Sequence, residues 1–235
     1  MQKDYTHIVY VIDESGSMQP LKDSTIKNYS NFITDQQKLK LKCTFSLYRV
    51  KTPPMHLYGI GLNTTVSTLN TPENEPRDLN NISSELVYFP DGGTPLYDVI
   101  GEAIDKTGAF LAKLKEQDRP GQVIFIIDTD GYENASKIFN SSEIKSMIEH
   151  QQNKYNWKFL YFGANQDSFA TAKHIGINLN TTSNYQHDVF GNQVKYTGMS
   201  VACGSLRSSG HLGAQSLSSV MEEASSLLKD INSAP

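Results

Sequence analysis

The amino-acid sequence predicts an α/β fold in which helices cover both faces of a mainly parallel central sheet. Two continuous apolar runs, at residues 8–12 and 123–127, are typical of strands that are buried on both faces. Amphipathic helical segments alternate with strand segments along the chain, as the crossovers of a parallel sheet require. The 235 residues, of which 38% are hydrophobic, are enough to bury the core of such a fold, and we expect residues 1–235 to form a single domain.

The first half of the chain contains the strands expected at one side of the sheet. After the run at 8–12, apolar residues recur at helical spacing over 18–33, and apolar and polar residues alternate over 41–48. Residues 55–60 form a further strand segment after a Pro-Pro break that is too short for a parallel crossover. We therefore expect 55–60 to pair antiparallel at the sheet edge, and we expect the polar stretch 63–85 to be a long surface loop.

The second half of the chain contains its clearest amphipathic helix, with apolar residues at helical spacing over 96–114. Ser141 or Ser142 can cap the helix that follows the second apolar run. Residues 157–162 are apolar and aromatic, and they predict the next buried strand. Asp167 can cap a further short helix. This order continues the alternation that a parallel sheet requires.

The residues after 180 have a weaker pattern. The segment 188–196 fits a hairpin around a Gly-Asn pair, and it also fits a simple polar loop. Apolar residues recur at helical spacing over 217–228 and predict a C-terminal helix that packs on the sheet. We expect a core of about residues 5–180, followed by 181–235 as a polar loop or hairpin and this helix.

Polar side chains follow the ends of both apolar runs. Asp13, Ser15 and Ser17 come after the first run, and Asp128 and Asp130 come after the second. In an open α/β sheet, ligands bind at the carboxyl ends of the strands, where the strand order reverses. Carboxylate and hydroxyl oxygens suit Mg²⁺, Mn²⁺ or Ca²⁺ better than zinc or copper. The sequence therefore predicts a site for a hard divalent cation at this edge.

Three motifs in this chain resemble a known metal site. Asp13-Glu14-Ser15-Gly16-Ser17, Gly92-Gly93-Thr94-Pro95 and Thr129-Asp130-Gly131 are similar, in order and spacing, to the three parts of the metal-ion-dependent adhesion site (MIDAS) of a von Willebrand factor type A (vWA) domain. The stretch 163–167 is similar to stand-alone members of that family in bacteria and their phages. The resemblance covers about three quarters of the chain. It implies a three-layer α/β/α, Rossmann-like fold whose mainly parallel sheet has one antiparallel edge strand.

The resemblance also implies roles for individual residues. Ser15, Ser17 and Thr94 would bind a divalent ion through their hydroxyls. Asp13 and Asp130 would hold the ion directly or through water. In this family an Asp or Glu of a protein partner usually completes the coordination shell, so the implied function is metal-dependent protein binding and not catalysis. Mg²⁺ is the expected ion because the cytosol offers far more of it than free Ca²⁺, and Mn²⁺ or Ca²⁺ would also fit these oxygen donors.

Several neighbouring residues have open roles. Asp128 could face the site as well as Asp130, although the Thr-Asp-Gly pattern of the family selects Asp130. Whether Asp128 adds negative charge near the ion stays open. We expect Glu14 to be solvated and Asp98 to interact with the dipole of its helix. Asn134 could orient a metal ligand from outside the coordination shell.

Two other kinds of function use the same motifs. A hydrolase or phosphoryl-transfer enzyme would use the ion as a Lewis acid, and a self-assembling protein would cap the ion of one copy with an acidic residue of the next. The enzyme is disfavoured because the sequence has no phosphate-binding loop and no nucleophile elbow. No Lys or Arg stands beside the motifs in sequence either. The sequence also leaves open whether the protein forms a homo-oligomer.

Composition argues against other partners. The net charge of −4 does not suit the broad basic face of a nucleic-acid-binding protein. No apolar stretch approaches the roughly eighteen residues of a membrane span, and the first apolar run is too short for a signal peptide. We therefore expect a cytoplasmic protein that binds neither nucleic acid nor membrane. The six histidines, His187 among them, have no metal-binding spacing, and we expect ordinary surface or core residues.

Overall fold

A six-stranded sheet forms the centre of the structure, a computed structural model that describes residues 1–52, 72–164, 167–214 and 216–233. The strand order is β3-β2-β1-β4-β5-β6. All neighbouring strands pair in parallel except β2 and β3, which are antiparallel. This confirms the predicted sheet, including its antiparallel edge. The strands are β1 (Gln2–Asp13), β2 (Lys42–Val50), β3 (Arg77–Asp78), β4 (Pro120–Thr129), β5 (Lys158–Gly163) and β6 (Thr182–Asn184).

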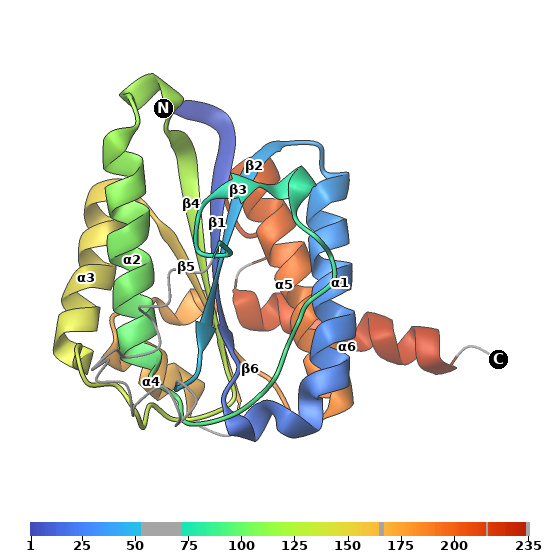
Figure 1. Cartoon of the computed structure of the whole chain (residues 1–235). Helices are drawn as coiled ribbons and strands as arrows, with labels where there is room; N and C mark the ends of the chain where they lie inside the picture. Colours follow the sequence, from blue (N-terminus) through green and yellow to red (C-terminus); the bar gives the residue numbers. More distant parts are fainter. Residues whose placement is uncertain (53–71, 165–166, 215, 234–235) are drawn as a thin grey trace.

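Helices cover both faces of this sheet, so the molecule has three layers (Figure 1). On one face lie α1 (Lys22–Lys38), α5 (Val189–Ser209) and α6 (Leu217–Ser233); on the other lie α2 (Leu96–Lys113), α3 (Ser141–Tyr155) and α4 (Ser168–His174). Short 3₁₀ helices occur at Gly16–Leu21 (η1), Leu79–Asn81 (η4), Glu116–Asp118 (η5) and Leu179–Thr181 (η6). No helix in the described part of the chain combines the length and apolar character needed to cross a membrane.

The middle of β1 shows why a continuous apolar run forms a central strand. Successive side chains of a strand point to opposite faces of the sheet. Ile8, Tyr10 and Ile12 pack into the core beneath α1, α5 and α6, whereas Val9 and Val11 pack into the core beneath α2 and α3. All five side chains are fully buried. Because both faces are covered, no polar side chain interrupts the run.

The antiparallel edge strand is β3, in which Arg77 and Asp78 pair with Phe45 and Thr44 of β2. The strand predicted at 55–60 lies outside the described residues. Residues 72–85, the described part of the predicted surface loop, contain β3 and η4.

The cap of α3 differs from the prediction. Asn140 is the N-cap, and its side chain accepts hydrogen bonds from the backbone N–H of Ser142 and Glu143. The Glu143 carboxylate accepts in turn from the Asn140 N–H at 2.8 Å, which completes a capping box. Ser141 and Ser142 therefore lie inside the first turn. Asp167 caps α4 as predicted.

The segment 188–196, predicted as a hairpin or a polar loop, instead begins α5, a helix of 21 residues. Its buried positions include the polar side chains Asn192, Lys195 and Arg207. Each has partners outside the helix; the Arg207 guanidinium, for example, donates to the backbone carbonyl oxygens of Gln36 (2.6 Å) and Leu41 (3.1 Å). The prediction was wrong because buried polar residues remove the apolar periodicity by which a helix is recognised in a sequence.

Candidate metal site

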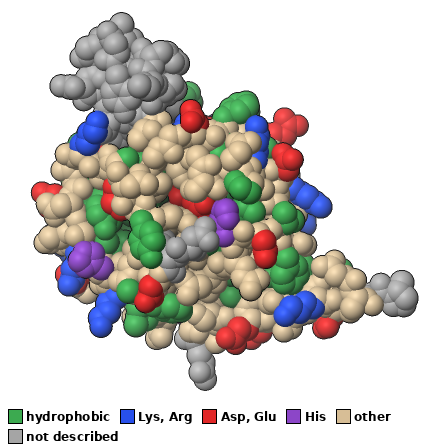
Figure 2. All heavy atoms as spheres, turned by 90° about the horizontal axis from the view of Figure 1, so that it is seen from below, with side chains coloured by type: hydrophobic (Ala, Val, Ile, Leu, Met, Phe, Trp, Pro, Cys, Tyr) green, Lys and Arg blue, Asp and Glu red, His purple; other side chains and the backbone are tan. Residues whose placement is uncertain are grey.

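The candidate site lies at the carboxyl end of the sheet, where β1 and β4 end side by side. The two strands run parallel with Ile12 opposite Asp128, so the residues that follow them meet at one place. The chain then turns away into η1 after β1, and into the loop before α3 after β4. Figure 2 shows the molecule from this end, with acidic side chains beside a histidine near the middle of the face.

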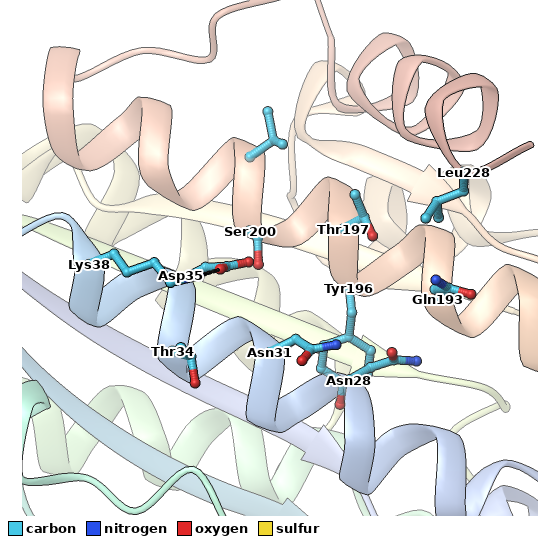
Figure 3. A pocket seen from close by; sticks show the side chains of 11 residues that line it. Asn28, Asn31, Thr34, Asp35, Lys38, Gln193, Tyr196, Thr197, Ser200 and Leu228 are labelled. Atoms are coloured by element: carbon cyan, nitrogen blue, oxygen red, sulfur yellow. Dashed lines mark hydrogen bonds and ion pairs between the residues drawn. The ribbon is translucent and has the colours of Figure 1, made fainter. Parts of the chain in front are cut away.

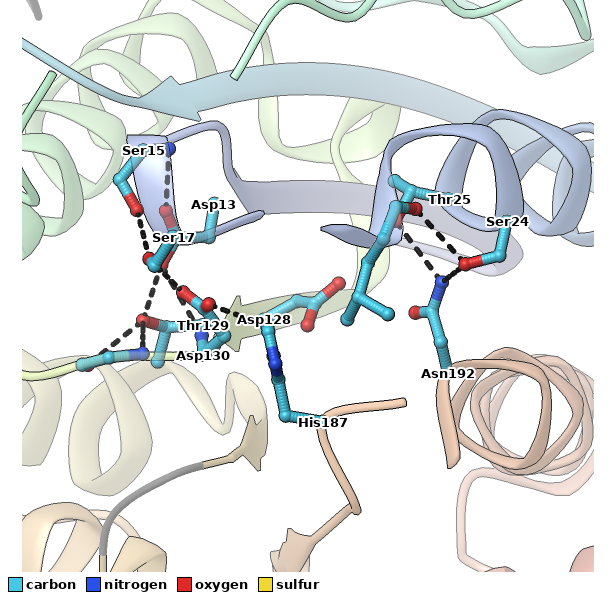
Figure 4. A network of polar contacts seen from close by, with 12 residues as sticks. Asp13, Ser15, Ser17, Ser24, Thr25, Asp128, Thr129, Asp130, His187 and Asn192 are labelled. Carbon is cyan, nitrogen blue, oxygen red and sulfur yellow. Dashed lines mark hydrogen bonds and ion pairs between the residues drawn. The ribbon is translucent and has the colours of Figure 1, made fainter. Parts of the chain in front are cut away.

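All predicted ligands except Thr94 belong to one hydrogen-bonded cluster (Figure 4). The Ser17 hydroxyl donates to Asp130 Oδ1 at 2.8 Å and lies 3.0 Å from the Ser15 hydroxyl. Asp13 Oδ1 accepts from the Ser15 N–H at 2.9 Å. Asp13 Oδ2 accepts from the Thr129 hydroxyl at 2.7 Å. Residues from the ends of two strands thus converge through their oxygen atoms.

Thr94 lies on a turn that docks beside this cluster. The Gly16 N–H donates to the Gly92 carbonyl oxygen at 3.0 Å, which joins the turn to the start of η1. The Thr94 N–H donates to Asn134 Oδ1 at 2.8 Å, so Asn134 orients the Thr94 backbone. The Thr94 side chain is buried, but it makes no hydrogen bond with the other predicted ligands, all of which are described.

The electrostatics of the cluster suit a cation. Asp13 and Asp130 are both buried. Burial, and then the charge of Asp130, raise the pKa of Asp13 to about 7, although hydrogen bonds from Ser15 and Thr129 oppose the shift. Asp130 Oδ2 has no hydrogen-bond partner. Two carboxylates buried close together are unfavourable, and a divalent ion would relieve this.

The spacing of the oxygen atoms also fits a bound ion. Two ligands that bind one ion at right angles, each at about 2.1 Å, lie about 3.0 Å apart. The distances from Ser17 Oγ to Ser15 Oγ and to Asp130 Oδ1 are 3.0 Å and 2.8 Å. No group of three or more His, Cys, Asp or Glu side chains suited to a metal occurs among the described residues. A metal at this place would therefore need the serine hydroxyls as well as the acidic side chains.

Glu14 differs from the prediction, because its side chain is buried and not solvated. It is 1% exposed and pairs with Arg49 and Lys51 of the β2 end, each at 2.9 Å. Glu14 Oε1 also accepts from the Phe89 N–H at 2.7 Å. Glu14 thus attaches the first motif to the end of β2 and to the segment around Phe89. Both of its carboxylate oxygens are engaged in these contacts.

Asp128 points away from Asp13 and Ser17, toward the α1 side of the sheet (Figure 4). Both its carboxylate oxygens accept from Lys195 Nζ, at 2.9 Å and 2.8 Å, and Oδ2 also accepts from the Tyr10 hydroxyl at 2.8 Å. Lys195 is fully buried, and desolvation lowers its pKa against the opposing effect of Asp128. Lys195 therefore neutralises the negative charge of Asp128. The sequence pattern did not predict that this lysine lies here.

His187 is a further residue at the site that sequence reasoning missed. Its Nε2 lies 2.9 Å from Asp130 Oδ2, and its side chain is 18% exposed. No motif spacing could have revealed it, because it lies just before α5, the helix that the sequence did not predict. The contact depends on how β6 and α5 return to the sheet, which is a property of the fold and not of local sequence.

Asp98 has a structural role outside the cluster. It lies in the first turn of α2, where a negative charge suits the helix dipole as predicted. Its carboxylate also accepts from the backbone N–H groups of Lys137 (2.8 Å), Ile138 (2.9 Å) and Phe139 (2.9 Å). Asp98 thereby fixes the loop that connects the third motif to α3.

A separate groove lies between α1 and α5, with a volume of about 330 Å³ (Figure 3). Its lining includes Asn28, Asn31 and Lys38 from α1, and Thr197 and Ser200 from α5. None of the predicted ligands lines it, so the groove is distinct from the metal site.

Comparisons with known proteins bear on the fold. No protein-family model matches the chain, and no curated protein matches it. Two structures of proximal thread matrix protein 1 from the mussel byssus are similar to it, with TM-scores of 0.53 and 0.52 and identities of 12% and 13%. The matches cover 85% and 83% of this chain, which spans a little under half of the mussel protein (47% and 46%).

A third similar structure is the VWA domain of SpRpn10, at 9% identity and a TM-score of 0.43, with 84% of this chain and 95% of that chain covered. At these identities the mussel structures show the arrangement of helices and strands, and they show neither ligands nor partners for this chain.

Proposed function

Because this chain has the von Willebrand factor type A fold, we propose that it is a binding module that holds a divalent metal ion and, through it, an acidic residue of a protein partner. The observation that carries the proposal is the cluster of Asp13, Ser15, Ser17 and Asp130 at the carboxyl ends of β1 and β4. The Thr94 turn docks beside it.

Each residue of the site has a role in this proposal. Ser15, Ser17 and Thr94 would offer uncharged hydroxyl oxygens, while Asp13 and Asp130 would balance the charge of a dication. A bound ion would supply an electrophilic position that attracts an outside carboxylate. The oxygen donors alone favour Mg²⁺, and Mn²⁺ or Ca²⁺ also suit them.

We propose binding in preference to catalysis because the cations near the site are already engaged. Lys195 pairs with Asp128, and Arg49 and Lys51 pair with Glu14. A phosphoryl-transfer enzyme would need such cations for the charge that develops on its substrate. We also propose that residues 1–235 form one domain, since α5 and α6 contribute to the same core as β1.

Isothermal titration calorimetry with Mg²⁺, Mn²⁺ and Ca²⁺ tests the metal site. We expect the wild-type protein to bind at least one of these ions and Asp13→Ala to bind none. Asp35→Asn is the matched control, because Asp35 is a half-exposed carboxylate paired with Lys38 on the surface of α1. Absence of binding heat for all the ions in the wild-type protein contradicts the proposal.

Two further measurements separate the competing functions. Size-exclusion chromatography with and without EDTA detects metal-linked self-assembly, which would make particle size depend on the chelator. A phosphatase and nuclease screen with Mg²⁺ and Mn²⁺ tests catalysis. Turnover that Asp13→Ala abolishes would favour the enzyme over the binding module.

A further inference from the structure

His187 faces the same carboxylate as the serine hydroxyls. Asp130 Oδ1 accepts from the Ser17 hydroxyl at 2.8 Å, and Asp130 Oδ2 lies 2.9 Å from His187 Nε2. The two sides of one carboxylate therefore carry an oxygen donor and a nitrogen donor (Figure 4). An ion held by both oxygens of Asp130 would have an imidazole beside it as well as a hydroxyl.

The contact between His187 and Asp130 is not a hydrogen bond. Although the two atoms are close, Nε2 and Oδ2 are both buried atoms without a hydrogen-bond partner, because their alignment is poor. Two atoms that bind one ion at right angles lie about 3.0 Å apart and point about 45° away from the line that joins them. Close approach with poor alignment is thus the arrangement expected of two ligands that face a common third atom.

The backbone on both sides of His187 is fixed, so the imidazole is held in place before any ion binds. The Tyr185 N–H donates to the Gly163 carbonyl oxygen at 2.9 Å, which anchors the segment to the end of β5. On the other side, the Asp188 side chain accepts from the Gly191 N–H at 2.6 Å and caps α5. A preorganised ligand adds affinity because little flexibility is lost on binding.

We propose that His187 Nε2 is a ligand of the metal ion and shifts the preference of this site from Mg²⁺ toward a first-row transition ion such as Zn²⁺ or Mn²⁺. This inference rests on the proposed function, since it concerns the same site. Imidazole nitrogen is a favoured ligand of transition ions, whereas Mg²⁺ prefers oxygen and keeps several waters. An imidazole among hydroxyls and carboxylates therefore separates the two classes of ion.

Calorimetric titration with Mg²⁺ and Zn²⁺ tests this preference in three proteins: the wild type, His187→Asn, and His174→Asn. His174 is the control because it is an exposed histidine on α4 whose Nε2 contacts the Ser141 hydroxyl. We expect His187→Asn to weaken Zn²⁺ binding by about tenfold or more and to change Mg²⁺ binding by less than about twofold. His174→Asn should change neither. Asp13→Ala is titrated as a reference, and only binding heat that is absent in Asp13→Ala is assigned to this site.

Pulsed electron paramagnetic resonance of the Mn²⁺-loaded wild-type protein gives a direct readout that does not depend on a variant. We expect modulation from a coordinated ¹⁴N nucleus, and we expect its loss in His187→Asn. A wild-type spectrum without a nitrogen signal overturns the proposal. Thermal unfolding of His187→Asn in EDTA shows whether the variant is folded.

The outcomes separate this inference from the proposed function. If the wild-type protein binds none of these ions, the proposed function fails. If the wild type binds Mg²⁺ and Zn²⁺, and His187→Asn binds each ion as tightly as the wild type does, only the role of His187 fails. An equal loss for both ions would make His187 a positioning residue for Asp130. Tighter binding in the variant would make it a competing counter-ion. Either result overturns its role as a ligand.

Discussion

At the scale of single residues, the site brings together charged groups that are unfavourable to bury alone. Asp13 and Asp130 lie at the ends of adjacent strands with hydroxyl groups between them. The raised pKa of Asp13 shows that its charged form is unfavourable in this arrangement. A carboxyl group whose pKa is higher in the folded state than in the unfolded state stabilises the fold when it is protonated and neutral, and this contribution is lost when the group is charged.

We predict that Asp13→Asn stabilises the metal-free protein at pH 8. The folded-state pKa of Asp13 is about 7, above its usual value of 3.8, so its contribution to stability is present at low pH and is lost as the pH rises through 7. Asparagine keeps the shape without the charge. Urea unfolding in EDTA should show a gain of about 2–4 kcal/mol at pH 8, and a much smaller gain at pH 5. Equal stability of both proteins at pH 8 would contradict the argument.

His7 gives a pH dependence of the opposite sign. It is fully buried in β1, where Nδ1 contacts the Thr44 hydroxyl at 2.9 Å and Nε2 has no hydrogen-bond partner. Burial lowers the pKa of His7 to about 4. The neutral form is therefore favoured in the fold, and its contribution to stability is present above the unfolded pKa of 6.5 and is lost as the pH falls toward 4.

We predict that the wild-type protein loses about 2 kcal/mol more stability than His7→Asn between pH 7.5 and pH 5. The asparagine amide can still reach a hydroxyl partner but does not take up a proton. Urea unfolding at both pH values measures the difference. His150→Asn, at an exposed position of α3, should follow the wild type. An identical pH dependence in His7→Asn would show that carboxylates alone cause the acid sensitivity.

At the scale of elements, the success of sequence reasoning depended on how local each interaction is. The apolar run at 8–12 and the motif around Asp130 are local patterns, and the structure brings their residues together as predicted. The helix α5 escaped prediction because the polar side chains of Asn192, Lys195 and Arg207 interrupt its apolar buried face, and buried polar residues are recognised only when their partners are known. Lys195 and His187 were missed for the same reason, since their partners lie on β4 and the loop after it.

The Lys195–Asp128 pair tests how α5 is attached to the sheet. Both side chains are fully buried, so Lys195→Met leaves the Asp128 carboxylate without its cation. We predict a loss of about 3–5 kcal/mol in the free energy of unfolding. The double variant Lys195→Met, Asp128→Leu should recover much of this loss because no charge remains buried.

A double-mutant cycle based on urea unfolding measures the coupling energy of this pair. Lys38→Met is the matched control, because Lys38 forms an exposed pair with Asp35 within α1. We expect it to change stability by less than about 0.5 kcal/mol. If Lys195→Met were equally mild, the buried pair would not hold α5 on the sheet.

At the scale of the whole molecule, the structure separates stability from binding. The apolar cores lie on the two faces of the sheet along β1 and β4, beneath the helices seen in Figure 1. The candidate ligands lie at or beyond the carboxyl ends of these strands: in the segment from the end of β1 into η1, after β4, on the turn before α2 and on the loop before α5. The opposite end, where η5 joins α2 to β4, contains none of the candidate ligands. An ion should therefore order one end of the molecule and leave the rest unchanged.

We predict that Mn²⁺ slows backbone hydrogen exchange in three separated segments: η1, the turn at 91–94, and the loop at 129–134. Each segment carries a candidate ligand or a residue that orients one, and none is continuous with another along the chain. Peptides from η5 and the C-terminal half of α2 serve as an internal control and should exchange at the same rate with and without the ion. Asp13→Ala should abolish the protection. Protection of only one segment would mean that the ion does not join the three motifs, and uniform protection would mean that it acts through global stability.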